Sequence, residues 1–253
     1  MKITILGSGS FFIDKNHSAP SYLIEFNGKN ILLDCGPGTL VQLAKIGFDP
    51  LKLDYVFLSH YHNDHTSDLI ALMFRPYVLE TYYGGKYDKI LTIVGPKGVK
   101  KFVKDVAEIF HHEVLPNFNK FKYLDLKPKM EFDDFSLETF KVEHSGLDAR
   151  SMRFLFGDKI IAYSGDAALP DGVANAAKKA DLLIVDCATP GHLVSASHLN
   201  TSQVGELCRE SGVKHVILSH QVPPGYKMDM VGQVKKAFKG KVTLAKDLLK
   251  IQL

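Results

Sequence analysis

Hydrophobic residues in this chain fall into short alternating or continuous runs that are separated by stretches with helical spacing. The runs predict strands over residues 2–6, 22–26, 30–33, 55–58, 89–94, 136–142, 152–156, 159–163, 181–185 and 215–218. The intervening patterns predict helices over residues 38–46, 67–79, 96–110, 170–179, 201–210 and 228–239. This order of elements predicts an α/β protein, and because no low-complexity linker interrupts it, we expect one domain over residues 1–253.

Three of the apolar strands end in a residue that can bind a metal ion. Tyr55-Val-Phe-Leu-Ser-His60 and His215-Val-Ile-Leu-Ser-His220 both end in Ser-His, and Lys159-Ile-Ile-Ala-Tyr-Ser-Gly-Asp166 ends in Asp. Open α/β sheets carry their sites at the carboxyl ends of their strands. We therefore expect these side chains at one edge, and the repeated ending indicates two related halves that face each other.

The strongest chemical signal is His60-Tyr-His-Asn-Asp-His65, directly after one of these strands. With 11 His and 28 acidic residues in 253 positions, such a string arises by chance in roughly two of a thousand chains. Alternate residues that leave a strand can direct their imidazoles to one point, and Asp64 and His65 at the following helix can reach a second. Zinc favours nitrogen and carboxylate ligands. A solvated histidine cluster is the alternative, but the string is internal and lies between a strand and a helix. It therefore predicts a metal site at His60, His62, Asp64 and His65.

Further ligands must come from elsewhere in the chain. His144, Asp166 and His220 each stand at the end of an expected element. Any one of them alone could be an ordinary hydrogen-bonded group, but together they can complete the coordination of two ions.

In this order, the residues resemble those of the metallo-β-lactamase superfamily over nearly the whole chain. The resemblance implies a four-layer αβ/βα sandwich in which two mixed β-sheets are flanked by helices. It implies that one ion is bound by His60, His62 and His144, that a second is bound by Asp64, His65 and His220, and that Asp166 bridges them. Asp34, in Ile31-Leu-Leu-Asp34, matches an early aspartate that supports the ligand histidines.

Within the superfamily, the chain is similar to ribonuclease Z and its phosphodiesterase relatives. Ser197-His198-Leu-Asn-Thr201 matches their extra histidine, which stabilises the transition state or protonates the leaving oxygen. A helix-flanking residue without a chemical role is the alternative for His198. Asp186 stands where ribonuclease Z has a glutamate, and residues 145–165 are too few for the arm that grips transfer RNA. We therefore do not expect structured tRNA as a substrate.

The resemblance predicts a metal-dependent hydrolase that uses two divalent ions. Zinc is the expected metal, with manganese or iron as alternatives, and Asp64 or Asp166 would orient the attacking water. A phosphodiesterase that acts on small or cyclic phosphodiesters is the favoured activity. Two alternatives remain: a hydrolase of carboxylic esters, lactones or thioesters, and a metal-dependent binding protein without turnover.

Composition changes this picture little. Hydrophobic residues make up 45% and charged residues 23% of the chain, and its net charge of +3 does not by itself indicate nucleic-acid binding. Cys35, Cys187 and Cys208 are widely spaced, which fits reduced thiols. No long apolar segment indicates a membrane span or signal peptide, so we expect a cytoplasmic protein. The aromatic stretch 82–87 could cover the substrate or contact a second subunit, and a homodimer remains open.

Overall fold

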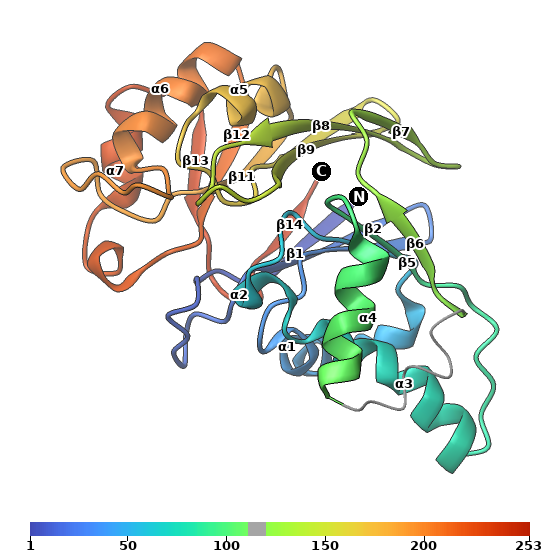
Figure 1. Cartoon of the computed structure of the whole chain (residues 1–253). Coiled ribbons are helices and arrows are strands. Elements are labelled where there is room, and N and C mark those ends of the chain that lie inside the picture. The colour runs from blue at the N-terminus through green and yellow to red at the C-terminus, as the bar shows by residue number, and fades with distance from the viewer. Residues whose placement is uncertain (111–119) are drawn as a thin grey trace.

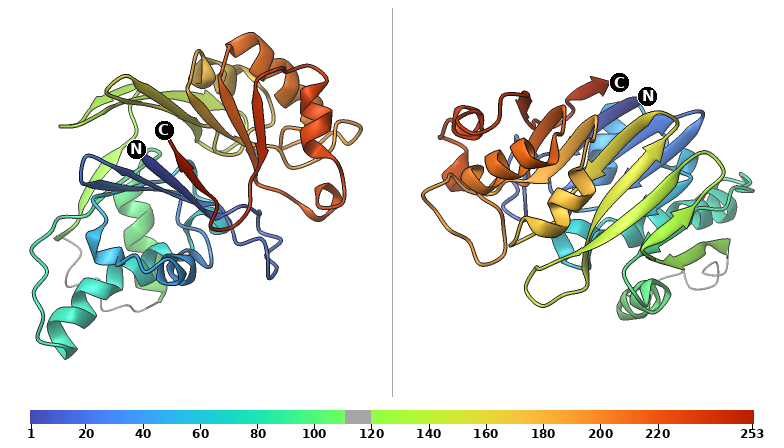
Figure 2. Two further views of the ribbon diagram at one scale, coloured as in Figure 1. Left: turned by 180° about the vertical axis from the view of Figure 1, so that it is seen from behind. Right: turned by 90° about the horizontal axis from the view of Figure 1, so that it is seen from above.

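The computed structural model describes residues 1–110 and 120–253. Two mixed sheets, each of seven strands, pack face to face, and helices cover both outer faces (Figures 1 and 2). The strand orders are β14-β1-β2-β3-β4-β5-β6 and β13-β12-β11-β10-β9-β8-β7. The expected four-layer αβ/βα sandwich is confirmed.

The first sheet and its helices contain most of the amino-terminal half. Its strands are β1 (Lys2–Gly7), β2 (Ser21–Phe26), β3 (Lys29–Leu33), β4 (Tyr55–Phe57), β5 (Thr92–Gly95), β6 (Lys122–Asp125) and β14 (Lys250–Gln252). Its helical segments are α1 (Thr39–Lys45), the 3-10 turn η1 (Pro50–Lys52), α2 (Asn63–Thr66), α3 (Leu69–Tyr82) and α4 (Val99–Ile109).

The second sheet follows in the chain. Its strands are β7 (Lys129–Glu131), β8 (Ser136–Val142), β9 (Ala149–Phe156), β10 (Lys159–Tyr163), β11 (Leu182–Asp186), β12 (His215–Ser219) and β13 (Lys241–Leu244). Its helical segments are α5 (Asp171–Ala177), α6 (Thr201–Ser211), the 3-10 turn η3 (Pro223–Gly225) and α7 (Met230–Lys235).

Three apolar clusters hold these four layers together. The cluster between the sheets includes Phe57 of the first sheet and Phe154 of the second, whose ring centroids are 5.1 Å apart with the rings edge to face. On the outer faces, apolar stripes of the helices pack against each sheet. In α4, for example, the buried residues Val99, Val103 and Ala107 recur every four positions, which is the spacing of one helical face.

Several turns and helix ends lie where the local sequence predicts them. Asn27 and Gly28 have φ angles of 46° and 75°, as the tight turn between β2 and β3 requires. Helix α6 begins at a capping box in which Asn200 and Gln203 bond each other's backbone, and it ends at Gly212 in the left-handed conformation.

Other expectations were wrong in detail. The helix expected to begin with Pro96 begins at Val99, because Gly98 adopts a left-handed conformation with φ of 85° just before it. The helix expected over residues 67–79 is α3, which begins at Leu69 and extends to Tyr82, and the short helix α2 before it was not expected as a separate element. Strands β6, β7, β13 and β14 were not expected; β14 has three residues and depends on pairing with β1.

The aromatic stretch 82–87 begins at the last residue of α3. Tyr82 and Tyr83 are 69% and 77% exposed at the end of α3. His111 and His112, which directly follow the helix expected over residues 96–110, lie outside the described residues. Among the described helices, none has both the length and the apolar character needed to cross a membrane.

Candidate metal centre

The expected ligand string forms a short loop between β4 and α2. Cys35 N–H donates to the His65 carbonyl oxygen at 2.8 Å, which holds this loop against the end of β3. Gly36 packs directly on Asp64, because a Cβ at position 36 would lie 1.9 Å from the Asp64 carbonyl oxygen. A glycine is therefore required there for the loop to bring its side chains inward.

Three histidines converge on the first candidate ion position. The Nδ1 atom of His62 lies 3.0 Å from Nε2 of His60 and 3.0 Å from Nε2 of His144. His144 donates its Nδ1–H to the carbonyl oxygen of Ser197 at 2.8 Å, so its Nε2 presents a lone pair to the group. Nitrogens bound to one zinc at ~2.0–2.1 Å in tetrahedral geometry are about 3.3 Å apart. The spacing of the three nitrogens is thus close to the spacing that a bound zinc ion requires.

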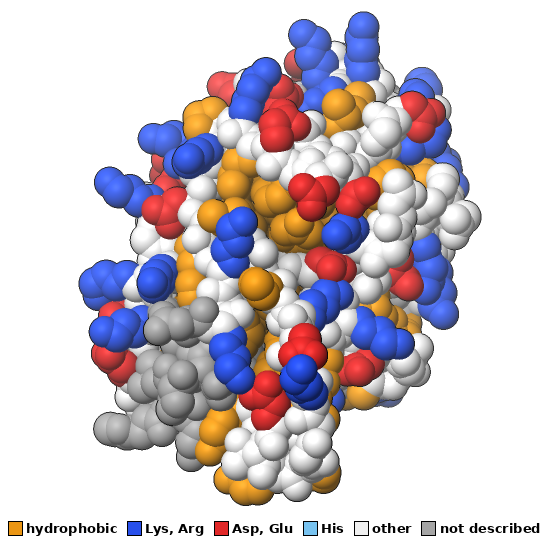
Figure 3. Space-filling view, turned by 90° about the vertical axis from the view of Figure 1, so that its right-hand side faces the viewer, with side chains coloured by type: hydrophobic (Ala, Val, Ile, Leu, Met, Phe, Trp, Pro, Cys, Tyr) orange, Lys and Arg blue, Asp and Glu red, His pale blue; other side chains and the backbone are white. Residues whose placement is uncertain are grey.

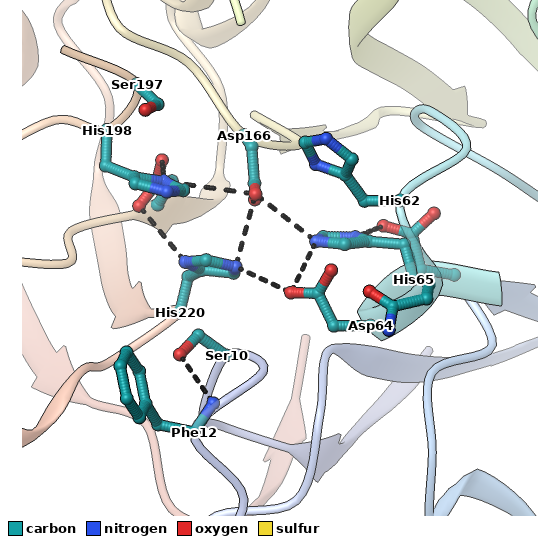
Figure 4. Close-up of polar contacts among 12 residues, drawn as sticks. Ser10, Phe12, His62, Asp64, His65, Asp166, Ser197, His198 and His220 are labelled. Carbon is teal, nitrogen blue, oxygen red and sulfur yellow. Dashed lines mark hydrogen bonds and ion pairs between the residues drawn. The ribbon is translucent and has the colours of Figure 1, made fainter. Parts of the chain in front are cut away.

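The second candidate position lies between two carboxylates and two histidines (Figure 4). The Oδ2 atom of Asp166 lies 3.3 Å from Nε2 of His65 and 3.2 Å from Nε2 of His220. The Oδ2 atom of Asp64 lies 3.6 Å and 3.5 Å from the same two nitrogens. Asp166 also lies 3.8 Å from Nε2 of His60, in the first group. Its carboxylate is therefore the link between the two groups.

Both groups fit a metal ion. The ligand atoms of His60, His62, His144 and Asp166 lie within 4.8 Å of one another, as do those of Asp64, His65, Asp166 and His220. Within the described part of the chain, Nε2 of His65 and both ring nitrogens of His220 are buried without a hydrogen-bond partner. Unpaired buried nitrogens are costly, and coordination to a cation would satisfy those that face the carboxylates. The structure thus brings together every residue expected as a ligand.

Charges in the centre also fit a bound cation. Burial raises the pKa of Asp166, but His220 and His65 outweigh it and hold that pKa well below its usual value. Burial lowers the pKa of His65, but Asp166 and Asp34 outweigh it and raise that pKa well above its usual value. Burial, followed by the neighbouring His65, lowers the pKa of His60. Clustered carboxylates that favour protonation of adjacent imidazoles produce a negative potential at the centre. A bound metal ion would be stabilised by that potential.

Asp34 organises the centre from behind. Its carboxylate accepts hydrogen bonds from Ser59 N–H at 2.7 Å and Ser59 Oγ at 2.8 Å, from His65 Nδ1 at 2.7 Å, and from the Tyr163 hydroxyl. Since the carboxylate can only accept, His65 carries its hydrogen on Nδ1 and turns Nε2 toward Asp64 and Asp166. Asp34 therefore contacts and orients a proposed ligand histidine, as the resemblance implied.

Sequence reasoning did not single out Ser59, Tyr163 or the Ser197 carbonyl. Ser59 directly precedes His60 and Tyr163 lies three positions before Asp166, both at strand ends, which was an available signal. Nothing in the local sequence marks the backbone oxygen of Ser197 as the partner of a histidine 53 positions earlier.

His198 lies at the edge of the centre and pairs with Asp186. Its Nδ1 atom is 2.9 Å from Oδ2 of Asp186 and 3.9 Å from Oδ2 of Asp166. Its ring stacks on His220 with centroids 4.8 Å apart. Burial lowers the pKa of His198, but Asp186 outweighs it and raises that pKa to about 9. The Asp186 carboxylate therefore favours the protonated imidazole of His198.

Comparison with known proteins agrees with this fold. The family model described as anti-Pycsar protein Apyc1 matches residues 1–238. The chain belongs to the anti-Pycsar protein Apyc1 family. This Apyc1-family chain is also 29% identical, over 97% of each sequence, to the probable metallo-hydrolase YhfI of Bacillus subtilis. It is 24% identical to ribonuclease Z of Archaeoglobus fulgidus, covering 100% of this chain and 97% of that protein.

Solved structures give the same result. The crystal structure of YhfI, a metallo-β-lactamase fold protein, superposes with a TM-score of 0.85 and 27% identity, covering 99% of this chain and 98% of YhfI. The short form of human tRNase Z shares the fold, with a TM-score of 0.79 and 20% identity over 100% of this chain and 99% of that one. The resemblance to the metallo-β-lactamase superfamily and its ribonuclease Z-like relatives is therefore confirmed, and this Apyc1-family chain is a metal-dependent hydrolase.

Proposed function

We propose that this protein is a dinuclear, zinc-dependent phosphodiesterase that hydrolyses small or cyclic phosphodiesters. The observation that carries the proposal is the pair of His198 and Asp186, which lies beside the two ligand groups and supplies a cationic proton donor there. Divalent ions held by the ligand groups would supply Lewis acidity and lower the pKa of a water molecule toward ~7. Zinc suits the imidazole and carboxylate donors better than calcium or magnesium, which prefer oxygen ligands.

Asp64 would orient the attacking water. Asp64 is 7% exposed as a residue, whereas Asp166 is 2% exposed and lies between His65, His220 and the first group. Burial raises the pKa of Asp64, but its contacts with His220 and His65 outweigh it and lower that pKa. Asp64 is therefore ionised at neutral pH and can accept a hydrogen bond from water.

His198 would protonate the leaving oxygen. Cleavage of a phosphodiester that is not activated releases an alkoxide, a strong base whose departure is assisted by a proton donor. The carboxylate of Asp186 accepts the Nδ1–H of His198, so Nε2–H remains available for donation. A thioester releases a thiolate, which leaves readily without such a donor. An unactivated P–O bond is thus the substrate for which this pair is most useful.

The substrate is proposed to be small because the segment between the proposed ligands His144 and Asp166 forms no protruding arm that could hold RNA. Residues 145–165 contain β9 and β10, which pair with each other inside the second sheet. On the face shown in Figure 3, Lys and Arg side chains are interspersed with Asp and Glu and do not form one continuous basic patch. Binding of folded RNA depends on several phosphate contacts from such a patch.

The test is a side-by-side assay of the zinc-loaded protein with bis(p-nitrophenyl) phosphate, cyclic nucleotides, a lactone, a thioester and a precursor tRNA. We expect the small diesters to give the highest kcat/KM. A higher value for the lactone or thioester would replace the phosphodiesterase assignment with the ester alternative. Efficient 3′ cleavage of the precursor tRNA would mean that another surface holds RNA.

A further inference from the structure

The loop between β1 and β2 presents two neighbouring phenylalanines to solvent. Phe11 is 64% exposed and Phe12 is 49% exposed, and Ile13 beside them is 49% exposed. The ring centroids of Phe11 and Phe12 are 4.5 Å apart with an interplanar angle of 37°. Single exposed apolar residues are common, but contiguous exposed apolar side chains often belong to a binding surface.

This loop lies next to the metal centre (Figure 4). Gly9 pairs as a β-bridge with Gln221, the residue after His220, and Gln221 N–H donates to the Ser8 carbonyl oxygen at 3.2 Å. Figure 4 shows Phe12 and Ser10 on the side of the centre where His220 lies. An extended chain advances at most ~3.6 Å per residue, so Phe12 lies within about 11 Å of Gly9. Gly9 in turn pairs with Gln221, the neighbour of His220.

The loop is held in place at its base and at its tip. The Asp247 carboxylate accepts hydrogen bonds from Ser8 N–H at 2.9 Å and from Ser18 N–H at 2.8 Å. The Tyr226 hydroxyl donates to the Phe12 carbonyl oxygen at 3.1 Å. The Tyr226 ring stacks on His17 with centroids 4.0 Å apart and an interplanar angle of 6°. The two exposed rings therefore project from a supported backbone, which lowers the entropic cost of binding.

We infer that Phe11 and Phe12 form a stacking platform for the base of a nucleotide phosphodiester whose phosphate lies at the metal centre. The inference rests on the proposed phosphodiesterase activity and adds the residues that would hold the base. Flat aromatic faces favour a planar ring over a flexible acyl chain, and every nucleobase offers such a face. Residues 7–13 contain no acidic side chain that would repel the phosphate.

The test compares two diesters that differ only in the base. One is a 3′,5′-cyclic nucleotide, and the other is the same cyclic ribose phosphate without a base. In the wild-type protein we expect the base to lower KM. In the double variant Phe11→Ala/Phe12→Ala we expect the ratio of the two kcat/KM values to fall about tenfold or more, mainly through KM of the nucleotide, as loss of base stacking predicts. The variant Phe12→Tyr should keep the ratio, because it retains the ring.

Tyr83→Ala is the matched control, since Tyr83 is an exposed aromatic residue at the end of α3. It should leave both kcat/KM values unchanged. An unchanged ratio in the double variant would overturn the inference. An equal loss of kcat/KM with both diesters would also overturn it, because the loop would then have a structural role. If sedimentation shows that a dimer dissociates together with this equal loss, the loop is a subunit contact. If the wild-type protein hydrolyses a lactone or thioester but neither diester, the proposed function itself has failed.

Discussion

Asp186 accepts a hydrogen bond from His198, with 2.9 Å between Oδ2 of Asp186 and Nδ1 of His198. Asp186 is the last residue of β11 and is buried, whereas the side chain of His198 is 23% exposed on the loop before α6. The other carboxylate oxygen of Asp186 lies 3.6 Å from Nδ1 of His220. One carboxylate thus contacts both the proposed proton donor and a proposed ligand, so metal content must be measured together with turnover to distinguish the roles of the two histidines.

Replacement of the proton donor should reduce turnover without releasing metal. For His198→Ala we expect kcat on a small diester to fall ~10²–10⁴-fold, the usual contribution of general acid catalysis. Elemental analysis of the same preparation should show the wild-type metal content. His198 also lies near Asp166 and His220 in a group that could bind an ion. Loss of metal in His198→Ala comparable to that in His62→Ala would therefore make His198 a ligand.

Metal content should follow the proposed division of ligands. The wild-type protein should contain close to two ions per chain, mostly zinc, and prolonged chelation should abolish activity. His62→Ala should lose ion content because it removes one of three converging nitrogens, and Asp166→Ala should lose more because its carboxylate faces both groups. Plasma emission spectrometry of the purified variants gives the counts. Full activity in chelator, with no bound transition metal, would refute the metal centre.

Removing the charge of the supporting carboxylate should weaken metal binding. Asp34→Asn leaves the shape but loses a charged acceptor for His65 Nδ1–H, so we expect zinc affinity to fall ~10–100-fold. Competition with a chromophoric chelator measures this. Asp14→Asn is the matched control, because Asp14 pairs with His17 at 3.0 Å outside the proposed ligand groups. Equal affinity in the wild type and Asp34→Asn would show that Asp34 does not tune the ligands.

His215 should contribute to the loss of stability in acid. Burial, followed by the nearby Lys241, lowers the pKa of His215 from 6.5 to about 4. Above pH 6.5 this histidine is neutral in both the folded and the unfolded chain, so it has no effect on the free energy of unfolding. Between pH 6.5 and pH 4 the unfolded chain binds the proton first, so the free energy of unfolding falls as the pH falls.

His215→Gln removes this titration and should show a shallower decline of urea midpoints between pH 6.5 and pH 4.5. The proposed metal ligands are unchanged in this variant, so their own protonation affects both proteins alike. The same decline in both proteins would mean that the His215 pKa is not lowered in the folded state.

Local patterns determined much of the secondary structure and the chemical character of the site. The strands at 136–142 and 159–163 follow from short-range periodicity, and β8 and β10 occupy those ranges. The string from His60 to His65 needs only a strand end and a helix start to direct its side chains. Short strands such as β7 and β14 could not be foreseen, because their three residues each are specified by the neighbouring strand and not by their own pattern.

The sequence by itself determined which residues can bind a metal, because donor chemistry and strand ends are local properties. Only the tertiary structure decided which of them meet. His62 and His144 are 82 positions apart, and Tyr163 is 129 positions from Asp34. The packing of the loops also decides that His144 donates to the Ser197 carbonyl oxygen. It likewise places Phe12 on the same side of the centre as His220. These contacts are set when two twisted sheets bury their apolar faces against each other, since that packing fixes the loops at their edges to one another, whereas local periodicity specifies each strand separately.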